Sequence, residues 1–458
     1  MRDIVLLAFI AGMLAMGFKR PFLWVLLYIY VDIVAPQKVA WGILTQLSIS
    51  LVVFVIAFAG YFLLDSKKGS KVSMRQGLIV LLLVWCGMTT LWAEFQDSAW
   101  EKWDWVWKAL VFAAFLPLTL RTKLRIEAAA LVMVLSAATI IIPAGIKTVF
   151  SGGGGYGVLA SLVSENSGLY EGSTLSTIAI AMIPLIMWVA RHSSVVTERK
   201  PALIFAIALC FAALLVPIGT QTRTGLICIA LLGVLMMRSV RHKFLFGGLV
   251  ALGVLVAIPF LPAAYTERMS TITDHQSDQS ASTRVAVWEW TWDYAKSHPL
   301  GGGFDAYRGN SFTYDTRQVE VVGGVREVSY HQVTEESRAY HSAYFEILGE
   351  QGFVGLVIWL AVHLSGLWQM ERIRRRYAKR EDNESKRWRA LATALQHGHA
   401  IYLVGALFIG VGFQPFVFMM VGLEIALYAV CRRNWQEEPD RPWLRGQDGS
   451  SAMAGSPA

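Results

Sequence analysis

The chain has 458 residues, of which 55% are hydrophobic, 12% aromatic and only 16% charged. This apolar content exceeds the roughly 45 to 50% of soluble domains, and the mean hydropathy of +0.47 agrees. An ordinary soluble domain is therefore excluded. The formal net charge of +8 does not indicate nucleic acid, because the lysines and arginines lie in short loops and not along one stripe.

Apolar runs of the length that crosses a hydrocarbon core, about 17 to 25 residues or slightly less, recur along the whole chain. They predict an all-α polytopic membrane protein with about 12 to 13 transmembrane helices. We interpret the first run as a retained span and not as a signal peptide, because no cleavage site of small residues follows it. The predicted spans are residues 4–18, 21–35, 42–64, 77–93, 105–120, 127–150, 173–190, 202–218, 225–237, 244–261, 344–370, 399–412 and 416–430.

Positive residues between the spans fall in alternate loops, which indicates one orientation. The basic loops are residues 19–20, 67–75, 121–125, 199–200, 238–243 and 372–389. If all six are cytoplasmic, the amino terminus and the long polar segment 263–341 are external. Four regions follow: an amino-terminal bundle, 1–262; an external loop with one amphipathic helix, 263–341; further transmembrane helices, 342–431; and a disordered cytoplasmic tail, 432–458.

Four tryptophans precede or open the predicted span 105–120, namely Trp100, Trp103, Trp105 and Trp107. Tryptophan is enriched where a membrane meets water. We interpret the group as an aromatic belt at the outer interface. The four cysteines show no spacing typical of a metal site or a disulfide framework.

Arg223 lies in the sequence GTQTRTG, where span 225–237 begins on the external side. An arginine there is either a topological residue whose side chain reaches the interface or an anion-binding group. External positive charge runs against the usual trend, which favours the second interpretation. Thr222 and Thr224 add hydroxyl donors, and a guanidinium beside hydroxyls is suited to phosphate oxygens.

Arg284 opens a stretch in which Val285, Trp288 and Trp292 recur at near-helical spacing. This pattern predicts the amphipathic external helix, with Arg284 in its first turn. The tryptophans either stack on sugar rings or pack at the membrane interface, and packing is the commoner use. Pro299 and the glycines after it end the helix and allow a close backbone approach.

His341 opens the sequence HSAYFEILGEQGFVGL, where Tyr344 begins another span. A lone histidine at the end of a span is more often structural than catalytic. Its ordinary pKa near 6.5 nevertheless allows it to accept a proton from an attacking hydroxyl. Glu346 and Glu350 follow one and two helical turns later, and they either orient the imidazole or favour the amino end of the helix.

The order TRTG, an arginine before a tryptophan-bearing helix ending in HPLGGGF, and then HSAYFEILGEQGFVGL resembles the O-antigen ligase and polymerase superfamily of bacterial membrane glycosyltransferases. The opening of the chain, through QKVAWG, also resembles the O-glycosylation ligases associated with exosortase A systems. This chain has Thr222 and Thr224 where the family often has serine and glycine, and Ser342 where it often has asparagine.

The resemblance implies a GT-C-like membrane fold and the transfer of a glycan from a polyprenyl diphosphate carrier to an acceptor hydroxyl, in the bacterial inner membrane and on its periplasmic face. Arg223 and Arg284 would bind the diphosphate without a metal or other cofactor, and His341 would deprotonate the acceptor in an inverting displacement. We expect Thr222, Thr224, Trp288 and Tyr344 to contact substrate. The expected partners are a lipid-linked glycan donor, an acceptor that is a glycan, a lipid or a protein, and membrane lipid, but not nucleic acid.

Three other functions stay open. A polysaccharide polymerase of the same superfamily has nearly the same residues and differs in its acceptor. A polysaccharide or lipid transporter would show paired repeats and broken helices near the bilayer midplane, whereas the ionisable residues here gather at one surface. A membrane scaffold without chemistry would not need these residues.

Overall fold

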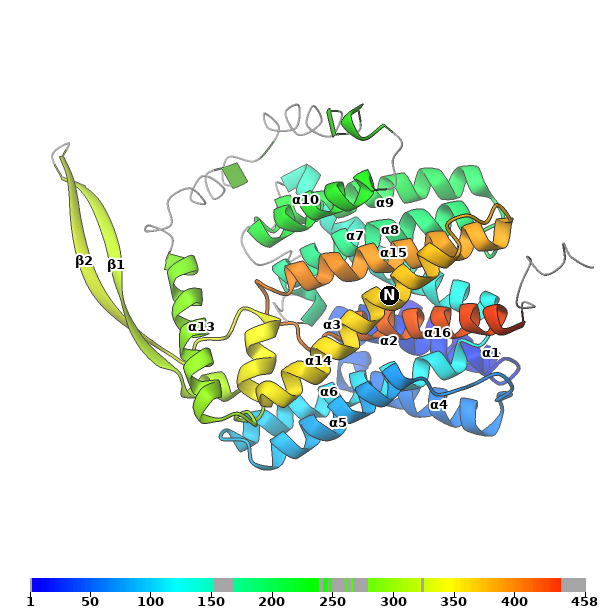
Figure 1. Ribbon diagram of the computed structural model, residues 1–458, viewed down its shortest axis with the longest axis horizontal. Helices are drawn as coiled ribbons and strands as arrows, with labels where there is room; N and C mark the ends of the chain where they lie inside the picture. Colours follow the sequence, from blue (N-terminus) through cyan, green and yellow to red (C-terminus); the bar gives the residue numbers. More distant parts are fainter. Residues whose placement is uncertain are drawn as a thin grey trace, which may run out of the picture.

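The computed structural model describes residues 2–151, 168–238, 279–322 and 325–437, together with positions 242–245, 247–248, 261 and 265–266. Long helices lie side by side in a bundle, and a helix and a β-hairpin project from one end of it (Figure 1). The all-α polytopic fold predicted from the sequence is confirmed.

The amino-terminal part of the bundle contains most of the helices. These are α1 (Arg2–Gly17), α2 (Phe22–Val34), α3 (Pro36–Val39), α4 (Ile49–Leu63), α5 (Met74–Leu91), α6 (Gln96–Thr119), α7 (Lys123–Ser151), α8 (Gly172–His192), α9 (Arg199–Gly219) and α10 (Arg223–Met237), with short 3-10 turns η1 (Ile43–Gln46) and η2 (Gly168–Tyr170). The carboxyl-terminal helices are α14 (Ala343–Arg376), α15 (Asn383–Gly405) and α16 (Pro415–Glu437).

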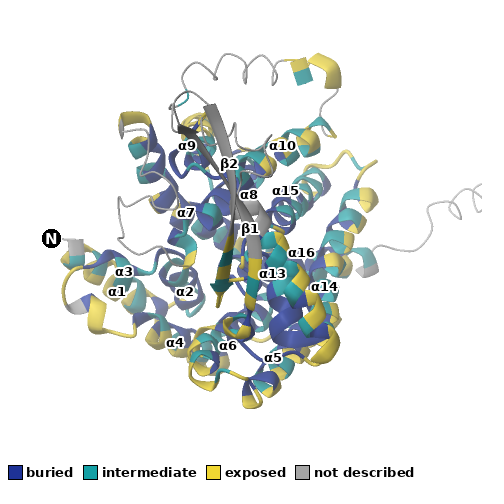
Figure 2. Ribbon diagram, turned by 90° about the vertical axis from the view of Figure 1, so that its left-hand side faces the viewer, coloured by how far each residue is buried: buried dark blue, intermediate teal, exposed yellow. Residues whose placement is uncertain are grey.

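Six helices of the described residues are long and apolar enough to cross a membrane, namely α5, α7, α8, α9, α14 and α16. The helices α1, α2, α4 and α10 are apolar but shorter. Helix α8 is among the most enclosed of the spans, because α9, α10 and α15 all pack against it. Viewed from the end that carries α13, the buried residues lie in the middle of the bundle and the exposed ones around it (Figure 2). An apolar periphery of this kind suits contact with lipid.

The projecting part contains the predicted amphipathic helix, α13 (Gln279–Ser297), and two elements that were not predicted. After a 3-10 turn, η5 (Ala306–Gly309), strands β1 (Ser311–Val322) and β2 (Val325–Glu336) form an antiparallel hairpin. Its register pairs Ser311 with Glu336 at the base and Val322 with Val325 at the tip. The described residues 279–322 and 325–341 therefore contain more regular structure than the single amphipathic helix expected there.

Several predicted boundaries were wrong. The span predicted to begin at residue 399 is the end of α15, which begins at Asn383, where Asp382 accepts a hydrogen bond from the Ser385 amide at 2.8 Å. Helix α6 begins at Gln96, nine residues before the predicted span, and so contains all four tryptophans. Helix α16 continues to Glu437, into the predicted tail. The predicted span 244–261 and the tail beyond Glu437 lie largely outside the described residues.

A kink at Gly352 divides α14 into a short outer part and a long span. Gly352 has φ 65° and ψ −170°, which is accessible to glycine and strained for other residues. The kink places its backbone against the glycine-rich turn after α13. There the Phe353 amide donates to the Pro299 carbonyl, and the amides of Gly302 and Gly303 donate to the carbonyls of Gly349 and Glu350, all at 2.9 to 3.0 Å. The turn thus joins α13 to the membrane bundle, as the glycines predicted.

Candidate functional site

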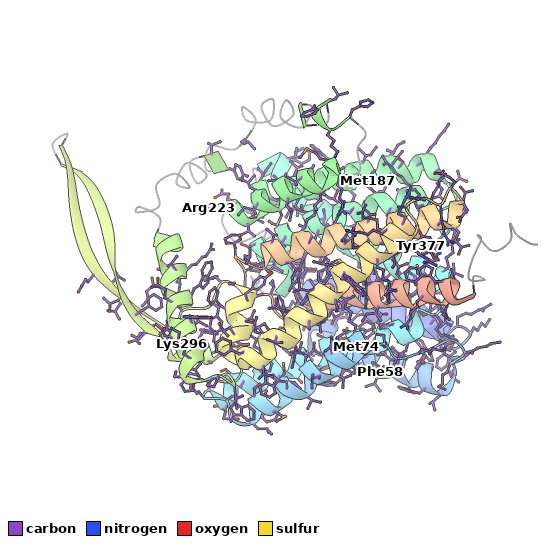
Figure 3. The ribbon with its side chains drawn as sticks, viewed as in Figure 1. Phe58, Met74, Met187, Arg223, Lys296 and Tyr377 are labelled. Atoms are coloured by element: carbon purple, nitrogen blue, oxygen red, sulfur yellow. The ribbon has the colours of Figure 1, made fainter. Side chains whose placement is uncertain are left out.

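Arg223 is the first residue of α10, at the end of the bundle that faces α13 (Figure 3). Its position depends on buried hydroxyls at the junction of α8 and α10. The hydroxyl of Thr222 donates to Ser176 of α8 at 2.9 Å, and Thr220 lies 2.8 Å from the same serine oxygen. A Cβ on Gly225 would lie 2.4 Å from Pro217 of α9, so the glycine of TRTG allows α10 to approach α9. The guanidinium is therefore presented by a fixed helix terminus.

Arg284 and His341 lie near each other, one in α13 and the other immediately before α14. Burial is the largest influence on the His341 imidazole, and the nearby Arg284 and Arg338 guanidinium groups add to it. Together they lower the pKa of His341 to about 4, whereas the Glu171 carboxylate acts in the opposite direction. The imidazole is consequently neutral at pH 7. The backbone of His341 has φ 48°, a left-handed conformation that is uncommon for a residue with a side chain.

Helix α8 connects this pair to Arg223. Glu171 caps the helix by accepting hydrogen bonds from the amides of Ser173 and Thr174, at 2.9 and 2.6 Å. Five residues later, Ser176 meets Thr222, the neighbour of Arg223. Five helical residues span roughly 7.5 Å. The first two turns of α8 thus carry both the serine that bonds to Thr222 and the carboxylate that influences the pKa of His341. Sequence reasoning did not foresee this because Glu171 belongs to no motif.

Trp288 supports the segment that carries His341. Its ring stacks on Phe345, with centroids 5.1 Å apart and planes inclined by 6°, and its indole nitrogen donates to the Tyr340 carbonyl at 2.9 Å. Helix α13 is therefore attached to the residues on both sides of His341. This packing is the use that the sequence favoured for the tryptophans, and contact of Trp288 with substrate stays a prediction.

The other predicted substrate contacts are partly or wholly engaged within the protein. The Tyr344 hydroxyl donates to the Leu403 carbonyl of α15 at 3.0 Å, and its ring meets Trp359 edge to face. Thr222 and Thr224 are buried beside Arg223. Their contact with substrate stays a prediction as well.

A buried ionic cluster below the site was missed in the sequence. Lys102 of α6 donates to Glu346 and Glu350 of α14, each at 2.7 Å, and lies 3.8 Å from Asp305. Glu350 also accepts from the Asp305 amide, and Glu346 from the amide of Gly412 at 2.9 Å. These two glutamates were expected either to orient His341 or to favour the helix end. The hydrogen bonds of Glu346 and Glu350 connect α14 to α6 and to the loop before α16 instead.

The tryptophans around Lys102 divide into two groups. Trp103 packs near Phe304 and Trp107 meets Phe54 edge to face, so both face the protein. Trp100 and Trp105 are exposed at 48% and 40%, as the predicted aromatic belt requires. Lys102 lies among these tryptophans in sequence, and the cluster was missed because sequence proximity does not show which helix face a residue occupies.

The end of the bundle where α8, α10 and α14 begin, called the rim below, carries the Arg223 guanidinium on α10 and the neutral His341 imidazole near Arg284. The cations can bind a diphosphate and stabilise the charge that grows on it when a bond to it breaks. The imidazole can accept a proton from a hydroxyl. A bound anion would also raise the pKa of His341 from its value in the free protein, because it offsets the positive potential of Arg284.

Comparison with protein families supports the same conclusion. Residues 207–360 match the family described as O-antigen ligase. This part of the chain is therefore similar to the O-antigen ligase family. The matched residues include Arg223, Arg284 and His341, so the similarity to the O-antigen ligase and polymerase superfamily covers all three predicted site residues.

The remainder of the chain is less informative. Residues 1–194 match a family of unknown function, and no curated protein matches the chain. The match to the O-antigen ligase family and the apolar helices together support a multi-pass membrane protein with an O-antigen ligase- or polymerase-like function. The similarity to ligases of exosortase systems stays a prediction.

Proposed function

We propose that this protein transfers a glycan from a polyprenyl diphosphate carrier to an acceptor hydroxyl on the periplasmic face of the bacterial inner membrane. One observation supports the proposal most directly: the Arg284 guanidinium is near enough to the His341 imidazole to lower its pKa. Arg223 follows Thr222, which bonds to Ser176 of α8. An arginine pair suits the diphosphate, and the imidazole suits the acceptor.

In the proposed reaction, the acceptor oxygen attacks the anomeric carbon while the bond from that carbon to the carrier phosphate breaks. The bonding electrons move onto the diphosphate, where Arg223 and Arg284 stabilise them. The hydroxyl proton moves to His341. Attack from the side opposite to the leaving group inverts the anomeric centre, and the two guanidinium groups take the part that a divalent metal plays in other transferases.

The surroundings of the site support this assignment. Thr222 and Thr224 place hydroxyls next to Arg223. The apolar outer surfaces of the helices offer a place for the polyprenyl chain. Helix α13 packs against α14 next to His341, and we expect this part of the chain to limit the access of water as a competing acceptor. The alternation of basic loops favours the periplasmic side for this end of the bundle.

The test uses purified protein, a lipid-linked glycan donor and candidate acceptors. We expect His341→Ala to lower the rate of transfer by roughly 10² to 10⁴, and Arg223→Ala and Arg284→Ala by on the order of 10² to 10³ each. Lys296→Ala is the matched control, because Lys296 is exposed on α13 and pairs only locally with Asp293 among the described residues. Full activity in all three site variants would overturn the proposal.

The same assay separates ligase from polymerase, since elongation of the donor without an added acceptor indicates a polymerase. In cells, loss of any of the three side chains should leave glycan-loaded carrier on the outer face of the membrane. Loaded carrier trapped on the cytoplasmic face would instead indicate a transporter.

A further inference from the structure

A cavity lies at the other end of the bundle from His341. It has a volume of about 590 Å³ and opens between α8, α10, α14 and α15. The volume is within the range of about 300 to 1,000 Å³ that is typical of ligand sites. Its apolar wall includes Ile183 and Met187 of α8 and Leu232 and Met236 of α10. Figure 3 labels Met187, which lies farther from α13 than Arg223 does.

Four arginines from four helices line the same cavity: Arg191, Arg238, Arg374 and Arg389. Glu371 bonds to Arg238 and Arg374, at 3.1 and 2.8 Å, and it is shared with Arg375. Arg389 donates to the Ala378 carbonyl at 2.8 Å. One carboxylate therefore pairs with three guanidinium groups, so it does not neutralise them all. The cavity lining has a net positive charge.

His397 adds a buried polar atom to this lining. The residue is 5% exposed, and its Nε2 has no hydrogen-bond partner within the described part of the chain. Buried polar atoms are nearly always satisfied in native proteins, and an exception requires an explanation. A ligand or ordered water in the cavity would provide the partner.

We propose that this cavity binds the phosphodiester headgroup of an anionic phospholipid. The arginines would contact the phosphate, and one acyl chain would lie against Ile183, Met187, Leu232 and Met236. Basic pockets between transmembrane helices on the cytoplasmic side are suited to anionic headgroups, and Arg238, Arg374 and Arg389 belong to segments whose charge predicts that side. A water-soluble phosphate compound would leave the apolar wall without a partner.

The site is distinct from the one around His341, although it uses the same helices. Helices α8, α10 and α14 each present one end to the rim and the other to the cavity. Lipid binding here does not depend on the proposed glycan transfer, so the two ideas can fail separately.

The experiment measures lipid retained by the full-length protein. The protein is released from micelles containing equal amounts of phosphatidylglycerol and phosphatidylcholine, and intact-mass spectrometry counts the bound lipids. We expect preferential retention of one phosphatidylglycerol. The double variant Arg191→Gln/Arg389→Gln should weaken this retention about thirtyfold, since each basic residue near an anionic surface contributes about 1 kcal/mol.

Two further variants complete the test. Arg432→Gln removes an exposed arginine of α16 outside the cavity and should retain lipid as the unmodified protein does. Ala390→Phe fills the cavity without changing charge and should also abolish preferential retention. Any one of four results would overturn the proposal. These are equal retention of both lipids, unchanged retention in the double variant, displacement of the lipid by millimolar inorganic phosphate, and preferential retention of an added polyprenyl phosphate.

Discussion

At the scale of single residues, the sequence identified Arg223, Arg284 and His341 but not their relationship. Each could be selected because it is an ionisable residue at the end of an apolar or amphipathic segment, where such groups are costly or unusual. Their surroundings come from distant parts of the sequence: Ser176 bonds to Thr222 beside Arg223, Trp288 bonds to Tyr340 beside His341, and the Glu171 carboxylate raises the pKa of His341. Long-range contacts of this kind leave no local pattern to interpret.

The pKa of His341 leads to a prediction about pH. A base is active when it is deprotonated. In the free protein, burial and the Arg284 cation lower the pKa of the His341 imidazole to about 4. We therefore expect kcat/KM, which reports the free enzyme, to stay level from pH 7 to about 5 and to fall below about 4. The rate constant kcat should begin to fall at a higher pH, because bound diphosphate raises the pKa of the imidazole.

Substitution of Arg284 provides the control for this profile. In Arg284→Gln, the acid limb, which is the fall of kcat/KM at low pH, should lie at a higher pH than in the unmodified protein. The reason is that one cause of the lowered pKa of His341 is removed. Lys296→Gln should leave the limb in place. An acid limb near 6.5 in the unmodified protein, or one that Arg284→Gln does not move, would contradict the assignment of the base. Activity recovered after return to pH 7 excludes unfolding as the cause.

At the scale of elements, periodicity and length predicted which segments form transmembrane helices more accurately than the residues at which these helices begin and end. Helix α15 begins well before the predicted span because its first half is amphipathic: Trp388, Leu391 and Leu395 face the core between charged residues. The hairpin was missed because its strands are polar. Alternation around Val319 and Val321, followed by Gly323-Gly324, was the available signal.

The addition of a single methyl group at the junction between α13 and α14 should lower the stability of the protein. In Gly352→Ala, the new Cβ would lie 2.3 Å from the Pro299 carbonyl oxygen, at a positive φ that alanine adopts only with strain. We expect a loss of about 3 kcal/mol in the free energy of unfolding, measured as a lower thermal midpoint in detergent. Gly77→Ala is the control, because nothing lies within 4 Å of a Cβ there. Equal midpoints for the two variants would show that the turn and the kink do not constrain each other.

The ionic cluster of α6 and α14 allows a second test at this scale. Lys102→Met would leave Glu346, Glu350 and Asp305 near one another without their common cation, and breaking a buried ion pair costs about 3 to 5 kcal/mol. Thermal unfolding should therefore shift strongly to lower temperature. Lys108→Met on the same helix should change little, because its partner Asp104 is 70% exposed.

A rescue variant makes the argument specific to charge. The double variant Lys102→Met/Glu350→Gln removes one of the opposed carboxylates and should recover part of the lost stability. No recovery would indicate that Lys102 acts through the packing of its side chain and not through its charge.

At the scale of the whole molecule, ionisable residues gather at three positions along the length of the bundle. The rim with His341 and the arginine-lined cavity occupy its two ends. Between them, Arg75 of α5 bonds to Glu424 of α16 at 2.6 Å, Glu424 meets His399 of α15 at 2.8 Å, and His399 meets His363 of α14 at 2.8 Å. This buried chain joins four helices below the rim, so the two ends belong to one rigid assembly and not to separate layers.

The orientation of this assembly is the last prediction, and it follows from charge. Basic segments gather at the end with Arg238 and the α14–α15 connection, which should face the cytoplasm. In intact spheroplasts, a membrane-impermeant maleimide should label Thr313→Cys in β1 but not Glu381→Cys, which should react only after permeabilisation. The unmodified protein is the control for its four native cysteines, three of them buried and Cys210 partly so. Labelling of Glu381→Cys in intact spheroplasts would place His341 in the cytoplasm and remove the basis for a periplasmic reaction.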